Sequence, residues 1–298
     1  MIHLLLVPYD SAHRGVRMGA GPHALIRAGL QERLESNGIA TRISELDPAN
    51  GFRAEIATAF DLHHVVRTTV LSVTKDEHLP IVVAGNSNTG VVGCLAAHNA
   101  DNVGLFWFDA HSDAETPETS TSGFFDGMGF ALALGECWKP KLNELHWNGL
   151  NGARSSLVAA REISPGAREL LHRRGVAIVS PAKARSASAT DALANALSQM
   201  RSAGVTRVHI HIDLDVLDPD LVGPANSYAL PDGLTVEQLL EHVRTILAEF
   251  SLASASVGSY DPSVDISGAV AAAGIEAITL LASSHLSTAA CERTADIQ

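Results

Sequence analysis

Leu105-Phe-Trp-Phe-Asp-Ala-His-Ser-Asp113 runs from four apolar residues into Asp, His and Asp at alternate positions. A short run that is apolar on both faces is typical of a strand buried in a parallel sheet. Alternate residues of an extended segment point to the same side. The pattern therefore predicts a strand over Gly104–Phe108 whose end brings Asp109, His111 and Asp113 to one place.

A second segment, Val208-His-Ile-His-Ile-Asp-Leu-Asp-Val-Leu-Asp-Pro219, has the same design, with Asp213 and Asp215 at alternate positions after an apolar strand. Carboxylates gathered at a buried strand end repel one another and pay a desolvation cost, so they need compensating positive charge. Carboxylate and imidazole ligands suit Mn, Fe, Co or Zn, and the oxygen-rich balance favours Mn. Two clusters indicate two ions that act together.

Strands and helices alternate along the rest of the chain, which favours a three-layer α/β fold. No linker, repeat or low-complexity tract interrupts the pattern, so residues 1–298 are predicted to form one domain. In such sheets ligands bind outside the carboxyl ends of the strands. The predicted strands are Ile2–Val7, Pro80–Ala84, Gly104–Phe108, Val176–Ser180, Arg207–Asp213 and Ser254–Gly258, and the clearest helices are Pro22–Glu35, Ala189–Ala203 and Thr235–Phe250.

The composition narrows the class of protein. Hydrophobic residues make up 46% and charged residues 18% of the 298, so we expect a large buried core. A net charge of −12 provides no electrostatic surface for nucleic acid or for an anionic membrane. No apolar run approaches the roughly 18 residues of a membrane span, and the first residues resemble a strand more than a signal peptide. A small-molecule substrate and a cytoplasmic location are the expectation.

The two Asp-rich segments, with two further stretches, resemble the arginase (ureohydrolase) family, which includes arginase, agmatinase and formiminoglutamase. Asp109–Asp113 resembles the family's D-A-H-x-D motif, and Asp213–Pro219 resembles its D-x-D-x-x-D-P motif. Arg14–Pro22 resembles the family's first loop, and Thr119–Gly123 resembles the loop after the first metal motif. The metal motifs are highly specific in combination.

This resemblance implies a fold, a reaction and a cofactor. The fold is an arginase-like three-layer α/β/α sandwich on an eight-stranded, mainly parallel sheet. The reaction is manganese-dependent cleavage of a C–N bond of a guanidino-type small molecule, by a hydroxide that bridges two Mn²⁺ ions in each subunit. Homo-oligomers, as trimers or hexamers, are common among such proteins.

The resemblance also implies a role for each metal-binding residue. Asp109 and Asp213 would each bridge both ions. Asp113 would bind the first ion only, and His111 and Asp215 would bind the second ion only.

One departure from the family affects the first metal site. The family takes a histidine ligand from a G-G-D-H-S segment, whereas this chain has Ala84-Gly-Asn-Ser-Asn-Thr-Gly90. Either Ser87 or Asn88 stands in the histidine's place, and each offers only a neutral oxygen. The first site is therefore predicted to bind its ion more weakly than the second, or to leave one ligand position to water.

Other departures fall in the substrate pocket. Asp126 matches the family's proton-shuttling histidine, so it is the candidate catalytic residue for proton transfer. Ser259 matches a glutamate that clamps the guanidinium, Glu115 matches an asparagine, and Ser122 is retained; these three are the candidate substrate-binding residues. Plain L-arginine is therefore not the expected substrate. A divergent branch that acts on a modified guanidine, typified by an Nω-hydroxy-L-arginine amidinohydrolase, is the named alternative.

His209 and His211 share the side of the strand that carries Asp213. His211 could hydrogen-bond a ligand carboxylate, could replace the missing first-site histidine, or could be an ordinary core histidine. The residues alone leave these alternatives open.

Two other functions compete with the hydrolase. A catalytically impaired relative with a structural or regulatory role would explain the missing histidine and the altered clamp. A different hydrolase, such as an amide-cleaving or deacetylating enzyme on a related sheet, is disfavoured by the D-A-H motif.

Overall fold

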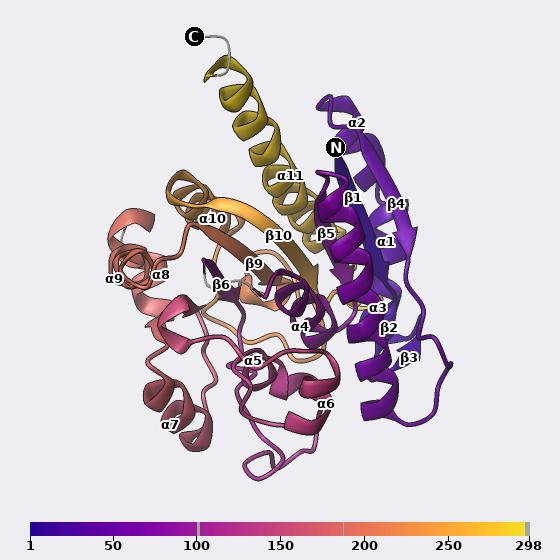
Figure 1. Cartoon of the computed structure of the whole chain (residues 1–298), viewed down its shortest axis with the longest axis vertical. Helices are drawn as coiled ribbons and strands as arrows, with labels where there is room; N and C mark the ends of the chain where they lie inside the picture. The colour runs from indigo at the N-terminus through magenta and orange to yellow at the C-terminus, as the bar shows by residue number, and fades with distance from the viewer. Residues whose placement is uncertain (100–101, 187, 296–298) are drawn as a thin grey trace.

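The computed structural model, which describes residues 1–99, 102–186 and 188–295, contains one eight-stranded sheet. Every strand pairing in this sheet is parallel, and helices lie along both of its faces (Figure 1). The predicted three-layer α/β/α fold is confirmed. In spatial order the strands are β4 (Thr41–Glu45), β1 (Ile2–Val7), β5 (Leu79–Ala84), β10 (Ser251–Gly258), β9 (Arg207–Asp213), β6 (Val103–Phe108), β7 (Ser155–Val158) and β8 (Ala177–Val179).

The α-helices are α1 (Gly21–Arg27), α2 (Leu30–Ser36), α3 (Glu55–Lys75), α4 (Ser87–His98), α5 (Gly129–Ala133), α6 (Lys139–Glu144), α7 (Pro165–Arg174), α8 (Pro181–Ser186), α9 (Ala189–Ser202), α10 (Val236–Glu249) and α11 (Ala269–Ala295). Eight of them fall into two groups according to the elements they contact. Helices α3 and α5 pack on α4, and α3 and α4 reach β1, β5, β9 and β10, whereas α1, α2, α9, α10 and α11 form the opposite layer. None of the described helices is long and apolar enough to cross a membrane.

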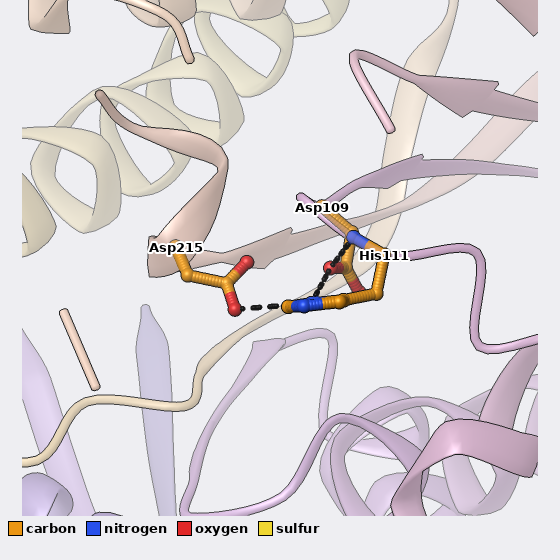
Figure 2. A group of neighbouring side chains, drawn as sticks. All are labelled: Asp109, His111 and Asp215. Carbon is orange, nitrogen blue, oxygen red and sulfur yellow. Dashed lines mark hydrogen bonds and ion pairs between the residues drawn. The ribbon is translucent and has the colours of Figure 1, made fainter. Parts of the chain in front are cut away.

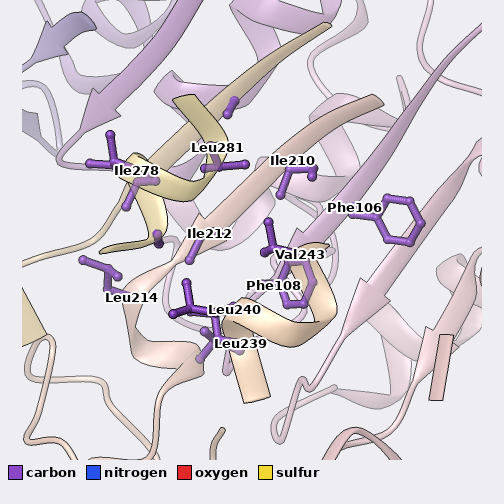
Figure 3. Close-up of a cluster of buried hydrophobic side chains, with 14 of the residues drawn as sticks. Phe106, Phe108, Ile210, Ile212, Leu214, Leu239, Leu240, Val243, Ile278 and Leu281 are labelled. Atoms are coloured by element: carbon purple, nitrogen blue, oxygen red, sulfur yellow. The ribbon is translucent and has the colours of Figure 1, made fainter. Parts of the chain in front are cut away.

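Alternation along the central strands separates the core from the polar side chains. Ile210 and Ile212 of β9 pack with Phe106 and Phe108 of β6 against α10 and α11 (Figure 3). The residues between them, such as Trp107, point to the face covered by α4 and α5. The α4 face therefore receives the side chains of the Asp-rich segments, as the period of two predicts.

Two strands of the eight-stranded sheet and the break in one helix were not predicted. The edge strand β4 is only half-buried, and β7 opens with two serines, so neither shows the apolar run used to find strands. The predicted single helix Pro22–Glu35 is wrong, because Gly29 adopts a φ of 99° and divides it into α1 and α2. Ile2–Val7 and Arg207–Asp213 match the observed strands at both ends.

The first loop lies against the start of α4. It consists of a two-stranded hairpin, β2 (Tyr9–Asp10) with β3 (His13–Arg14), and a 3₁₀ turn, η1 (Arg17–Ala20). A Cβ on Gly85 would lie 2.2 Å from the Tyr9 carbonyl oxygen, so only glycine permits this approach. The contact brings Asp10 beside the residues that begin α4.

Candidate metal centre

A cleft of about 330 Å³ opens at the carboxyl ends of the central strands. Its wall includes Asp113 after β6, Asp213 and Asp215 at the end of β9, and Ser259 after β10. This is the place where parallel sheets bind ligands. The structure thus gathers residues that are far apart in the sequence, as predicted.

The tightest group in the cleft consists of Asp109, His111 and Asp215 (Figure 2). One ligand atom from each lies within 4.8 Å of the others. His111 Nδ1 is 3.4 Å from Asp109 Oδ1 and 3.3 Å from Asp215 Oδ2. The two carboxylates are buried, while the His111 side chain is 25% exposed toward the cleft. Three of the four predicted second-site ligands are therefore assembled.

Neighbouring groups hold this cluster in place. Trp107 Nε1 donates to Asp109 Oδ2 (2.8 Å), and the backbone N–H of Ala110 donates to Asp215 Oδ1 (3.0 Å). The guanidinium of Arg161 donates to the carbonyl oxygens of Asp215 (2.7 Å) and of two further loop residues, Val216 and Leu230. Arg161 was missed by sequence reasoning, since no spacing signal ties a lone arginine to carbonyls more than fifty residues away.

The electrostatics of the cluster favour a cation. Burial raises the pKa of Asp109, and the Asp215 charge adds to the effect. Burial would lower the pKa of His111, but hydrogen bonds to Asp109 and Asp215 outweigh it and raise that pKa to about 12. Burial likewise opposes ionisation of Asp215, yet His111 holds the pKa of that carboxyl below its usual range. Several aspartates thus share one imidazolium, and divalent ions with carboxylate and imidazole ligands would fit this donor set.

Asp213 and Asp113, two of the predicted first-site ligands, lie in the same cleft as this group. Asp213 Oδ1 accepts a hydrogen bond from the backbone N–H of Asp215 (2.9 Å), and both Asp213 and Asp113 line the cleft. Asp113 has a left-handed φ of 44°, and its carbonyl accepts hydrogen bonds from Phe130 (2.7 Å) and Ala131 (3.2 Å). A strained non-glycine residue persists when its surroundings enforce it, and such residues cluster at functional sites.

The structure separates the two candidates for the missing histidine. Ser87 Oγ donates to Asp213 Oδ2 (2.9 Å) and lies 3.1 Å from Ser259 Oγ. Asn88 instead turns away from Asp213, with its amide on Asp126 Oδ1 (2.8 Å) and its carbonyl oxygen 2.9 Å from His63 Nε2. Ser87 is therefore the residue that faces the predicted metal ligand.

The candidate substrate-binding and catalytic residues all line the same cleft, namely Ser122, Glu115, Ser259 and Asp126. Ser122 is exposed at the mouth, whereas Ser259 is buried at the floor with a φ of 60°. Asp126 is buried in the wall, at the start of the 3₁₀ turn η2 (Asp126–Met128). The structure brings these residues together; their individual roles stay predictions.

The strand histidines are held mainly by serines of β10. His209 pairs through both ring nitrogens, with Ser254 Oγ (2.7 Å) and Ser256 Oγ (2.9 Å). His211 Nδ1 pairs with Ser256 Oγ (2.7 Å), and its ring lies against Trp107, with ring centroids 4.5 Å apart. Within the described residues, His211 Nε2 has no hydrogen-bond partner. These contacts favour the core interpretation and show no bond from His211 to a ligand carboxylate.

Comparison with known proteins assigns the chain to a family. The model described as "Arginase family" matches residues 1–283, nearly the whole chain. The chain belongs to the arginase family. An N(omega)-hydroxy-L-arginine amidinohydrolase from Streptomyces lavendulae is 32% identical over 251 residues, which cover 84% of this chain and 85% of that protein. An arginase from Staphylococcus aureus is 25% identical over 278 residues, which cover 89% and 91%.

Solved structures support the same fold. The arginase from Bacillus subtilis superposes with a TM-score of 0.85 at 23% identity, covering 95% of this chain and 98% of that one. The family match and the two relatives show that the chain is a hydrolase that acts on C–N bonds of linear amidines. The prediction from the two Asp-rich motifs is confirmed at this level.

Proposed function

We propose that this arginase-family chain is a binuclear, manganese-dependent amidinohydrolase that cleaves a guanidino-type small molecule. The observation that carries the proposal is the buried group of Asp109, His111 and Asp215, with Asp213 and Asp113 beside it in one cleft. If each residue has the role that the family resemblance implies, Asp109 and Asp213 would be ligands of both ions, Asp113 of the first, and His111 and Asp215 of the second. When bound, the ions would supply Lewis-acid activation of water and of the substrate.

The chain's own residues prepare the site for that chemistry. Trp107 and the Ala110 backbone N–H fix the orientation of two ligand carboxylates. Outer contacts of this kind are typically worth 10–100-fold in metal affinity. Arg161 braces the loop after β9 from behind, so that Asp215 stays in reach of His111.

The lining of the cleft supports a cationic substrate that is not plain L-arginine. Glu115 and Glu162 add negative charge beyond the metal ligands, and Phe124 lies against Tyr228 at the mouth, with ring centroids 5.6 Å apart. Ser122 and Ser259 offer hydroxyl groups to the bound molecule. Nω-hydroxy-L-arginine is the first candidate, because the relative from Streptomyces lavendulae is named for that substrate.

The decisive experiment loads the purified full-length protein with excess Mn²⁺ and screens guanidino compounds. The panel is L-arginine, Nω-hydroxy-L-arginine, agmatine and a formimino compound, with release of urea, hydroxyurea or formamide as the readout. Bound manganese with turnover of one member supports the proposal. Protein that retains no metal refutes it, and protein that binds metal but turns over nothing supports the impaired relative instead.

The proposal includes two further properties, the oligomeric state and the location of the protein. We expect a homo-oligomer, a trimer or hexamer, which light scattering on the purified protein would test. We also expect a cytoplasmic location, for which cell fractionation is the test.

A further inference from the structure

Asp126 makes an unusual set of contacts for a carboxylate in a substrate cleft. Its Oδ1 accepts hydrogen bonds from the backbone N–H (2.9 Å) and the side-chain amide (2.8 Å) of Asn88. Its Oδ2 accepts from the backbone N–H of Ser87 (3.2 Å) and the side-chain amide of Asn86 (2.8 Å). Both oxygens are therefore occupied by donors from the start of α4, although Asp126 lies 39 residues after Ser87.

The start of α4 depends on this outside carboxylate. The first N–H groups of a helix have no partner within the helix, and a negative charge there is stabilising. Asn86 is in the capping position, but its side chain makes no capping hydrogen bond. Its Oδ1 accepts from the Ser11 N–H (2.8 Å), which ties the first loop to the same point. Asp126 therefore accepts the hydrogen bonds of the first backbone N–H groups of α4 in place of a capping side chain.

The position of the helix start determines where the Ser87 hydroxyl lies. Ser87 is the first residue of α4 and is fully buried. Its Oγ lies between Asp213 Oδ2 (2.9 Å) and Ser259 Oγ (3.1 Å). A shift or fraying of the first turn of α4 would move this hydroxyl away from Asp213.

We propose that Asp126 is a positioning residue: it fixes the first turn of α4 and so holds the Ser87 hydroxyl as an oxygen ligand for the metal ion that Asp113 and Asp213 bind. The inference rests on the proposed metal-dependent function. A neutral hydroxyl is a weaker ligand than an imidazole for a borderline divalent ion, so this ion is held less tightly than its neighbour. Asp126 acts on the site through Ser87, not by contact with the ion.

The test is a Mn²⁺ titration of the purified full-length protein, with the free-ion signal followed by electron paramagnetic resonance. The variants are Asp126→Asn, Ser87→Ala, the double variant, and Glu115→Gln as a control that removes a charge from the same cleft without touching α4. We expect Asp126→Asn and Ser87→Ala each to lower the affinity for the more weakly bound ion by roughly tenfold. The affinity for the more tightly bound ion should change by less than roughly twofold. The double variant should lose no more affinity than the more damaging single variant does.

Several outcomes would overturn the inference. Asp126 would not act through Ser87 if the two effects added, or if Asp126→Asn weakened the ion no more than Glu115→Gln does. Unchanged metal affinity with a lower kcat and an altered pH profile would assign Asp126 to proton transfer. Ser87→Ala, a small change, keeps the test open if Asp126→Asn fails to fold. Wild-type protein that bound no manganese would instead refute the proposed function itself.

Discussion

The two halves of the metal centre are built differently. The side made by Asp109, His111 and Asp215 draws its ligands from the segments that directly follow β6 and β9, and one ligand atom from each residue lies within 4.8 Å of the others. The other side joins Asp213 to Asp113 in a strained loop conformation and to Ser87 at a helix start. Strand ends are held by the sheet, whereas a loop and a helix start need supports of their own.

This difference suggests how a site can lose a ligand and keep its shape. The position of the absent histidine is filled by a serine hydroxyl on Asp213, and Asn86, Asn88 and Asp126 form a hydrogen-bonded frame around it. Each carboxylate oxygen of Asp213 and of Asp126 accepts a hydrogen bond. We call Asp109, His111 and Asp215 the strand side, and Asp113, Asp213 and Ser87 the helix side. We expect the strand side to dominate metal affinity and the helix side to determine how tightly a second ion is bound.

The largest effect is expected from Asp215→Ala, which removes a ligand from the strand side. Metal affinity should fall by more than the roughly 10–100-fold that is lost when a hydrogen-bond partner of a ligand is removed, because Asp215 is itself a predicted ligand. Turnover of any guanidino substrate should fall below detection. Asp220→Ala, an exposed acid on the same loop, is the matched control and should change neither metal binding nor turnover. Equal effects of the two variants would contradict the assignment of the strand side.

The next effect concerns His63, which supports the helix side through Asn88. Burial lowers the pKa of His63 to about 4, against 6.5 in a free side chain, despite the hydrogen bond to Asn88. Between pH 6.5 and pH 4, His63 therefore binds a proton in the unfolded chain but stays neutral in the folded chain. The contribution of His63 to the free energy of unfolding is full above pH 6.5 and declines as the pH falls toward 4, by roughly 3 kcal/mol for a shift of this size.

Urea unfolding of chelator-treated protein at pH 7, 5.5 and 4 measures this contribution. His63→Gln should show an acid decline smaller than the wild type by about that amount, since glutamine stays neutral. His172→Gln, at an exposed position, should decline like the wild type. Parallel curves for wild type and His63→Gln would show that His63 is not the group that resists protonation.

A smaller effect should come from restoring an imidazole to the helix side. Ser87→His places the ring where the hydroxyl now meets Asp213, and affinity for the weaker ion should rise about tenfold because imidazole is the better ligand. The larger side chain should also lower the thermal stability of the metal-free protein, since overpacking a buried site costs about 1–3 kcal/mol. Asn88→His should bring no gain in affinity, because Asn88 faces Asp126 and His63. A gain from Asn88→His alone would reverse our placement.

The strand side could be predicted from sequence far better than the helix side. Asp109, His111 and Asp215 stand at fixed spacing after apolar strands, so local periodicity places them at the carboxyl ends of β6 and β9, which are neighbours in the sheet. The frame around Ser87 depends on contacts between residues 38–40 positions apart, for which the sequence gives no spacing signal.

The rest of the fold shows the same limit. The central strands were predicted to within a few residues because both of their faces are buried. The half-buried β4 and the serine-led β7 lack that signal. The break at Gly29 was missed because a glycine within an apolar helical pattern does not by itself show that it will adopt a positive φ.

The smallest effect is expected at the mouth of the cleft, away from both halves of the metal centre. Glu115 lines the cleft, where its carboxylate accepts a hydrogen bond from Thr119. In Glu115→Gln the KM for a guanidine with a second positive charge, such as agmatine, should rise by up to about fivefold, the range of a partly exposed ion pair. The KM for substrates that carry a carboxylate should rise less or fall, and kcat should hold. Glu118→Gln, exposed on the same loop but outside the cleft, is the control. A fall in kcat with unchanged KM would assign Glu115 to catalysis at the metal centre and contradict its assignment to substrate binding.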